Sequence, residues 1–99
     1  MAENPLTVIK KLDLELFKNV EATQTLALTD GVLPRKVKLL IAMALDASHG
    51  TIEGTRALTQ QAMNAGATKE EVMETLRVAQ YISGVGCVYT AAHAIKDLF

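Results

Sequence analysis

Apolar residues along the chain recur at steps of three and four, the spacing of one face of an α-helix, and no segment alternates at period two. Turn-forming residues divide this pattern into five predicted helices. They run from Pro5 to about Leu28, from Pro34 to His49, from Thr51 to Ala65, from Thr68 to the bend at Gly84, and from Val85 to Phe99. The predicted fold class is therefore all-α, without a sheet.

Capping signals support several of these helix boundaries. Asn4 before Pro5 is typical of an N-cap followed by a first-turn proline. Gly66 is placed to end the third helix in a left-handed conformation. Thr68 and Glu71 have the spacing of a capping box, in which each side chain accepts a hydrogen bond from the other residue's amide.

The apolar stripes predict which side chains the helices bury. The inner stripe of the third helix comprises Ile52, Leu58, Ala62 and Ala65, and that of the fourth comprises Val72, Leu76 and Ala79. The second helix differs, because residues 39–45 are apolar on every side, as in an element surrounded by protein.

Ninety-nine residues, 49% of them apolar, are enough for one domain at residues 5–99, preceded by a flexible segment at residues 1–4. A domain of this size cannot easily cover both the second helix and the seam along the fifth. That seam comprises Val88, Ala92, Ile95 and Phe99. We therefore expect a homo-oligomer that buries part of this surface between subunits.

The composition excludes several kinds of partner. A net charge of −1 provides no field that would attract nucleic acid or an anionic membrane. The third and fourth helices imitate a helix-turn-helix, but Glu70, Glu71 and Glu74 would repel phosphates. The longest apolar run has seven residues, against about 20 for a membrane span. With no signal-peptide pattern at the start, the expected location is cytoplasmic.

Cysteine and histidine spacing gives no sign of a metal or cofactor. The single cysteine, Cys87, rules out an internal disulfide and a Cys-x-x-Cys pair, and it is expected to be a buried small residue. His49 and Glu53 are separated by a helix-ending glycine, and no paired-histidine motif is present. We predict neither a metal nor a cofactor.

From residue 33 onward, the order of motifs resembles the carboxymuconolactone decarboxylase family, which includes the alkylhydroperoxidase D branch. The similar features are Leu33-Pro34-Arg35, the apolar helix that closes at Gly50, Arg56, the turn at residues 65–68 followed by Glu70-Glu71, the segment from Tyr81 to Val85, and His93. The resemblance implies an alkylhydroperoxidase D-like helical fold that assembles into trimers or hexamers.

The resemblance also implies which chemistry is missing. Peroxidase relatives carry a glutamate in the second helix, Cys-x-x-Cys at the start of the third, and a histidine four residues later. Those positions fall on Leu39, Thr51, Gly54 and Leu58. Without a nucleophilic and a resolving thiol, dithiol peroxidase chemistry is not expected. The decarboxylase branch is similar at Arg56 and His93, although its third-helix histidine also falls on Leu58.

Five residues are candidates for a site where the second helix ends and the third begins. His49 and His93 are candidate acid–base residues, although a histidine at a helix end is also favoured by the helix dipole. Arg56 is a candidate clamp for a carboxylate together with Glu53, although the two could equally form a surface ion pair. Thr51, with Gly54, is small and leaves room for a ligand.

Two further patterns have an ordinary alternative explanation. Tyr89, His93 and Asp97 are spaced by four and form either a proton relay or the polar side of the last helix. Arg35, Lys36 and Lys38 crowd the start of the second helix, against its dipole. They are therefore expected to face solvent, an acidic partner or a ligand.

Two functions remain open from the sequence. The first is a carboxymuconolactone decarboxylase-like enzyme that binds a small carboxylate or lactone in a cleft between helices. The second is a non-catalytic oligomeric scaffold or ligand-binding protein on the same fold. A shared fold does not transfer an activity, so the sequence alone does not choose between them.

Overall fold

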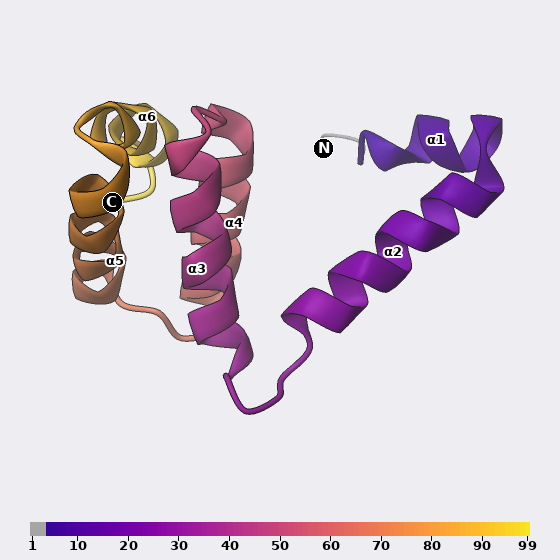
Figure 1. Cartoon of the computed structure of the whole chain (residues 1–99), viewed down its shortest axis with the longest axis horizontal. Coiled ribbons are helices and arrows are strands. Elements are labelled where there is room, and N and C mark those ends of the chain that lie inside the picture. The colour runs from indigo at the N-terminus through magenta and orange to yellow at the C-terminus, as the bar shows by residue number, and fades with distance from the viewer. Residues whose placement is uncertain (1–3) are drawn as a thin grey trace.

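The computed structural model describes residues 4–99, which contain six α-helices and no β-strand. The helices are α1 (Leu6–Leu12), α2 (Leu14–Leu28), α3 (Arg35–Ser48), α4 (Ile52–Asn64), α5 (Lys69–Ser83) and α6 (Gly86–Ile95). Helices α3–α6 form a bundle, and α1 and α2 form an arm that extends away from it (Figure 1). The all-α prediction is confirmed. Within residues 4–99, each helix lacks the length and apolar content that crossing a bilayer requires.

The first predicted helix is in fact two helices, so the predicted count of five was wrong. The chain breaks at Asp13, whose backbone has φ −152° and ψ 89°. Its side chain accepts a hydrogen bond from the amide of Leu16 at 3.0 Å and so caps α2. Aspartate is among the best N-cap residues. The apolar spacing continues across this single non-helical residue, which is why periodicity did not show the break.

The other predicted boundaries are close to those observed, except that the last helix ends at Ile95 and not at Phe99. The capping box is confirmed: Thr68 Oγ1 accepts from the Glu71 amide at 3.1 Å, and Glu71 Oε1 accepts from the Thr68 amide at 2.8 Å. Gly50 and Gly84, which separate helices, have φ of +77° and +87°. Residues with a Cβ rarely adopt such angles, so glycine allows the chain to turn there.

The bundle has one main core and a smaller one. Met43 and Val72 are fully buried in the main core, which α3, α5 and α6 share. The predicted burial of Val72, Leu76 and Ala79 in α5 is confirmed. The seam predicted on the last helix is corrected in two ways. Ile95 is buried inside the chain's own core, and Phe99 lies beyond the end of α6.

The buried face of α4 was predicted only in part: Ala62 is completely buried and Leu58 is half-buried against the core, as predicted. Ile52 and Ala65 are exposed, whereas Thr55 and Thr59 are completely buried. The two hydroxyl groups donate to backbone carbonyls four residues earlier, at 2.6 and 2.7 Å. This bonding satisfies the polar atom and leaves a small methyl-bearing surface that packs in the core. Hydropathy alone assigns threonine to the polar face, so the apolar pattern missed these two core residues.

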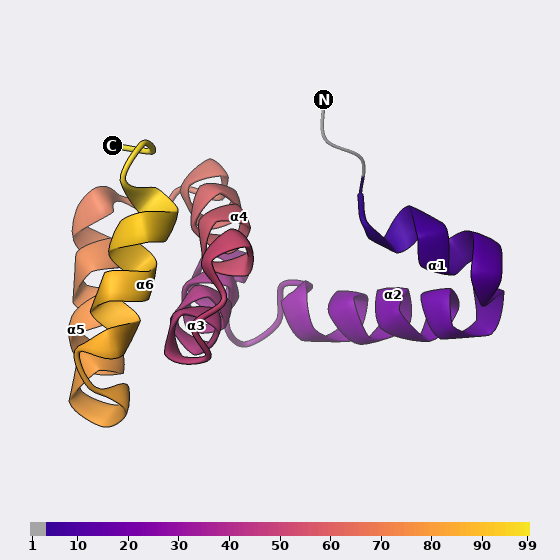
Figure 2. The same ribbon diagram turned by 90° about the horizontal axis from the view of Figure 1, so that it is seen from above.

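The arm has no buried residue in either helix. α1 folds back beside α2, and the pair points away from the bundle in both views (Figures 1 and 2). The Cα radius of gyration is 14.2 Å, against about 12.6 Å for a compact chain of this length. Of the N-terminal segment predicted to be flexible, residues 1–3 lie outside the described residues.

Candidate functional site

The turn between α3 and α4 positions two of the predicted site residues. The His49 amide donates to the carbonyl of Leu45 at 3.0 Å, and the Thr51 amide donates to the carbonyl of Asp46 at 3.0 Å. His49 therefore ends α3 and Thr51 begins α4, on either side of Gly50. Both side chains are exposed.

The space beside Gly54 is filled, whereas the sequence predicted room for a ligand there. A Cβ at position 54 would overlap the Oδ2 atom of Asp46 and lie 3.1 Å from its Cγ. The Asp46 carboxylate thus occupies the position that a side chain at 54 would need. A negative charge is favourable beside the first turn of α4, because the helix dipole is positive there.

Sequence reasoning missed Asp46. The available signal was an acidic residue in the last turn of α3, where the helix dipole disfavours negative charge. Such a residue needs a compensating environment, and the start of α4 provides it.

Arg56 is held by α6 and not by Glu53. Its Nη1 atom donates to Oδ1 of Asp97 and, at 3.4 Å, to the carbonyl of Ala94. The predicted pairing of Arg56 with Glu53 is not among the ion pairs formed by residues 4–99, and Glu53 is exposed. The hydrogen bond from Arg56 lowers the pKa of the Asp97 carboxyl below its ordinary value. Arg56 therefore links the first half of α4 to the residues that follow α6.

The predicted line of Tyr89, His93 and Asp97 is not connected. Tyr89 and His93 are both exposed on α6, and the hydrogen bonds described for residues 4–99 do not join them. Asp97 lies one turn after His93, beyond the end of the helix, where it binds Arg56. Of the predicted site residues, Arg56 thus contacts α6 at its C-terminal end, which also carries His93.

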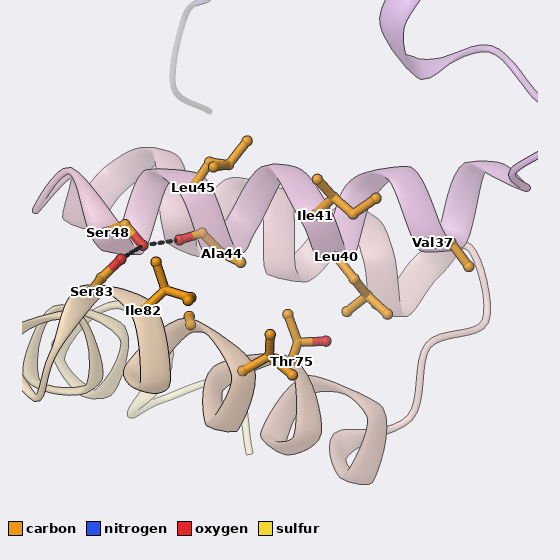
Figure 3. Close-up of a pocket in the computed structure, with 11 residues that line it drawn as sticks. Val37, Leu40, Ile41, Ala44, Leu45, Ser48, Thr75, Ile82 and Ser83 are labelled. Carbon is orange, nitrogen blue, oxygen red and sulfur yellow. Dashed lines mark hydrogen bonds between the residues drawn. The ribbon is translucent and has the colours of Figure 1, made fainter.

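The largest of the described pockets lies away from these residues, in a groove between α3 and α5. This α3–α5 groove has a volume of about 450 Å³. Figure 3 shows the side chains of the two helices that line it. It is lined by Val37, Leu40, Ile41, Ala44, Leu45 and Ser48 of α3 and by Thr75, Val78, Ala79, Ile82 and Ser83 of α5. At one end Ser83 donates to Ser48 at 2.9 Å, and Ser48 donates to the Ala44 carbonyl. None of the five predicted site residues lines the groove.

Comparison with known proteins identifies the family. The sequence model of the carboxymuconolactone decarboxylase family matches residues 15–97. The chain belongs to the carboxymuconolactone decarboxylase family. The crystal structure of a family member from Legionella pneumophila, in its apo form, is similar with a TM-score of 0.86 and 33% sequence identity. The similarity covers 92% of this chain and 81% of that one. No functionally curated protein matches the chain.

Two core residues occupy positions at which the resemblance implies a glutamate and a histidine in the peroxidase relatives. Leu39, where peroxidase relatives carry a glutamate, is completely buried and packs with Ala62 and Ala67. Leu58, where relatives carry a histidine, is half-buried against both cores. Both positions therefore contribute to packing in this chain.

Proposed function

We propose that this protein is a non-redox member of the carboxymuconolactone decarboxylase family. In this proposal it works as a homo-oligomer, a trimer or hexamer, and binds a small organic carboxylate, or a lactone that carries one, at Arg56. The observation that supports the carboxylate site is that Arg56 already holds a carboxylate, that of Asp97, at an accessible surface. The side chains of Arg56 and Asp97 are 41% and 64% exposed.

The guanidinium group can accept a ligand in place of Asp97. Both hydrogen bonds that the Arg56 side chain makes within the described residues use one nitrogen, Nη1. Arginine has five N–H donors arranged to bind both oxygens of a carboxylate. Because an exposed ion pair stabilises a fold only weakly, a ligand that makes two parallel hydrogen bonds competes effectively with Asp97.

An enzymatic role needs an acid–base group near the bound carboxylate. His93 lies one turn before Asp97 and is the better placed of the two candidate histidines. His49, at the α3–α4 turn, is the other candidate. A decarboxylase-like reaction would use such a group to protonate the carbon that keeps the electron pair when carbon dioxide leaves.

A non-catalytic scaffold is the second candidate function. It is favoured by the burial of Leu39 and the packing of Leu58, which put core side chains where relatives have a proton relay. Under this alternative, self-association is retained and the Arg56–Asp97 pair only links α4 to the end of the chain.

The carboxylate site is tested by calorimetric titration with a panel of small organic acids, some of which carry a lactone ring. Arg56→Ala should weaken binding by about tenfold or more, the usual effect of losing a hydrogen bond to a charged group. Asp97→Asn should strengthen binding, because it removes the internal competitor. Arg77→Ala, at an exposed arginine of α5, is the matched control and should change nothing.

The results separate the two functions. If Asp97→Asn leaves binding unchanged while Arg56→Ala only lowers stability, the pair is structural. If no acid in the panel binds, the scaffold function is favoured.

A second prediction concerns peroxide. With Thr51 and Gly54 in place of the two cysteines, the protein should not turn over peroxide with a dithiol reductant. The remaining thiol, Cys87, is buried, and its Sγ donates to the Gly84 carbonyl at 3.1 Å. A coupled peroxidase assay on wild type and Cys87→Ser checks this. Dithiol-dependent turnover that persists in Cys87→Ser would contradict our interpretation of α4.

A further inference from the structure

Two apolar surfaces are left uncovered by the residues that the structure describes. The first is the arm of α1 and α2, on which Leu12 and Leu26 are 78% and 84% exposed. The second is the α3–α5 groove, whose edges carry Val78 and Ile82 at 68% and 76% exposed. Isolated helices of this length are marginal in water, so an arm without a buried residue needs another surface to stay folded.

The connection between the arm and α3 directs the arm away from its own bundle. The Lys38 ammonium group donates to the carbonyl of Thr29 at 2.7 Å, and Asp30 accepts from the Arg35 amide. The Arg35 side chain also donates to the carbonyl of Leu28 at 3.4 Å. Two residues of the basic cluster that is unfavourable for the α3 dipole, Arg35 and Lys38, thus hold the end of α2, whereas Lys36 pairs with Glu71 of α5. A chain with this connection presents the arm to a neighbour.

The groove has the shape and chemistry of a surface that receives a helix. It has no charged side chain in its lining, so an apolar helix face enters without desolvating a charge. Its edges are highly exposed, whereas a small-molecule pocket buries most of its ligand. An apolar groove between two helices commonly binds a third helix. The groove is lined from Val37 to Ser48 on α3 and from Thr75 to Ser83 on α5, about 18 Å and about 13.5 Å of helix. At 15 residues, or about 22.5 Å, α2 is long enough to fill it.

The amount of exposed surface matches an exchange of arms between copies. The chain exposes 6987 Å², about 1,500 Å² more than the usual area for a folded monomer of 10.7 kDa. A standard interface buries about 800 Å² on each partner. A chain that donates one arm and receives another buries about that area twice, which accounts for the excess.

We infer that α2 of one copy lies in the α3–α5 groove of a second copy, and that each copy donates its arm in turn. This inference rests on the proposed self-association and is independent of the carboxylate site. It makes the interface heterologous, because the arm and the groove are different surfaces. Closed rings such as trimers follow directly from an interface of this type.

A complementation experiment tests the inference. One variant disables the arm (Leu16→Asp with Leu26→Asp), and another disables the groove (Val78→Asp with Ile82→Asp). All four side chains are exposed in the single chain, so the bundle should still fold, which circular dichroism checks. By sedimentation, wild type should be an oligomer and each variant alone a monomer. An equimolar mixture should form a heterodimer, because an intact arm then meets an intact groove.

Each other outcome overturns the inference in a recognisable way. A monomeric wild type would also overturn the proposed self-association. An oligomeric wild type whose groove variant still assembles would place the interface elsewhere. An arm variant that assembles alone would likewise show that grooves pair with each other. A mixture that stays monomeric would show that the arm of one copy does not bind the groove of another. As a matched control, Gln80→Asp on an exposed position of α5 outside the groove should leave assembly unchanged.

Discussion

Leu39→Glu, which introduces the acidic residue of the peroxidase relatives, should lower the free energy of unfolding by about 3–5 kcal/mol. Leu39 has no exposed surface and packs with Ala62 and Ala67, so the carboxylate would be buried without a partner. A domain of this kind has only about 5–15 kcal/mol in total. Urea unfolding followed by circular dichroism at fixed protein concentration measures the effect.

The sign of the pH dependence provides a check on this explanation. Burial favours the neutral acid, so the pKa of the introduced glutamic acid would rise above its value of about 4.3 in the unfolded chain. The ionic penalty is present above the raised pKa and disappears below about pH 4.

Leu39→Met should cost less than about 1.5 kcal/mol. Gln80→Glu, on an exposed position, should change stability by less than about 0.5 kcal/mol. A Leu39→Glu variant as stable as wild type would mean that position 39 can reach solvent.

Gly54→Ala should destabilise the protein by about 1–3 kcal/mol, the usual cost of overpacking. The new methyl group would collide with the Asp46 carboxylate and lie 3.2 Å from Cγ2 of Thr51. This result is opposite to the general expectation, because alanine in a helix is favoured over glycine by about 1 kcal/mol. Thermal unfolding of the single variant shows which effect is larger.

The effect of Gly54→Ala on stability should change from destabilising to stabilising when the Asp46 side chain is shortened. In an Asp46→Ala background the carboxylate is gone, and Gly54→Ala should then stabilise by about 0.5–1 kcal/mol. Gly86→Ala is a suitable control, since nothing lies within 4 Å of a Cβ added there. Equal effects of Gly54→Ala in both backgrounds would show that Asp46 does not fill the space.

The candidate site was only partly predictable. The resemblance directed attention to Arg56 and to the end of α3, and these residues lie on the expected helices. It did not predict that Arg56 would bind Asp97, because the two are 41 positions apart and only the packing of α4 on α6 brings them together. Asp46 was missed for the same reason, since its environment is the neighbouring helix.

The sequence by itself determined the helical class, most helix boundaries and the buried face of α5. These features depend on local rules: the 3.6-residue period, the Thr68–Glu71 capping box and the turns at Gly50 and Gly84. Only the tertiary structure determined which face of α4 enters the core and where the first helix breaks. It also determined that the arm points outward while an apolar groove stays open. Threonine can bury its hydroxyl on its own helix, and Asp13 caps a helix without disturbing the apolar period. Such outcomes depend on packing and on single hydrogen bonds, which hydropathy does not encode.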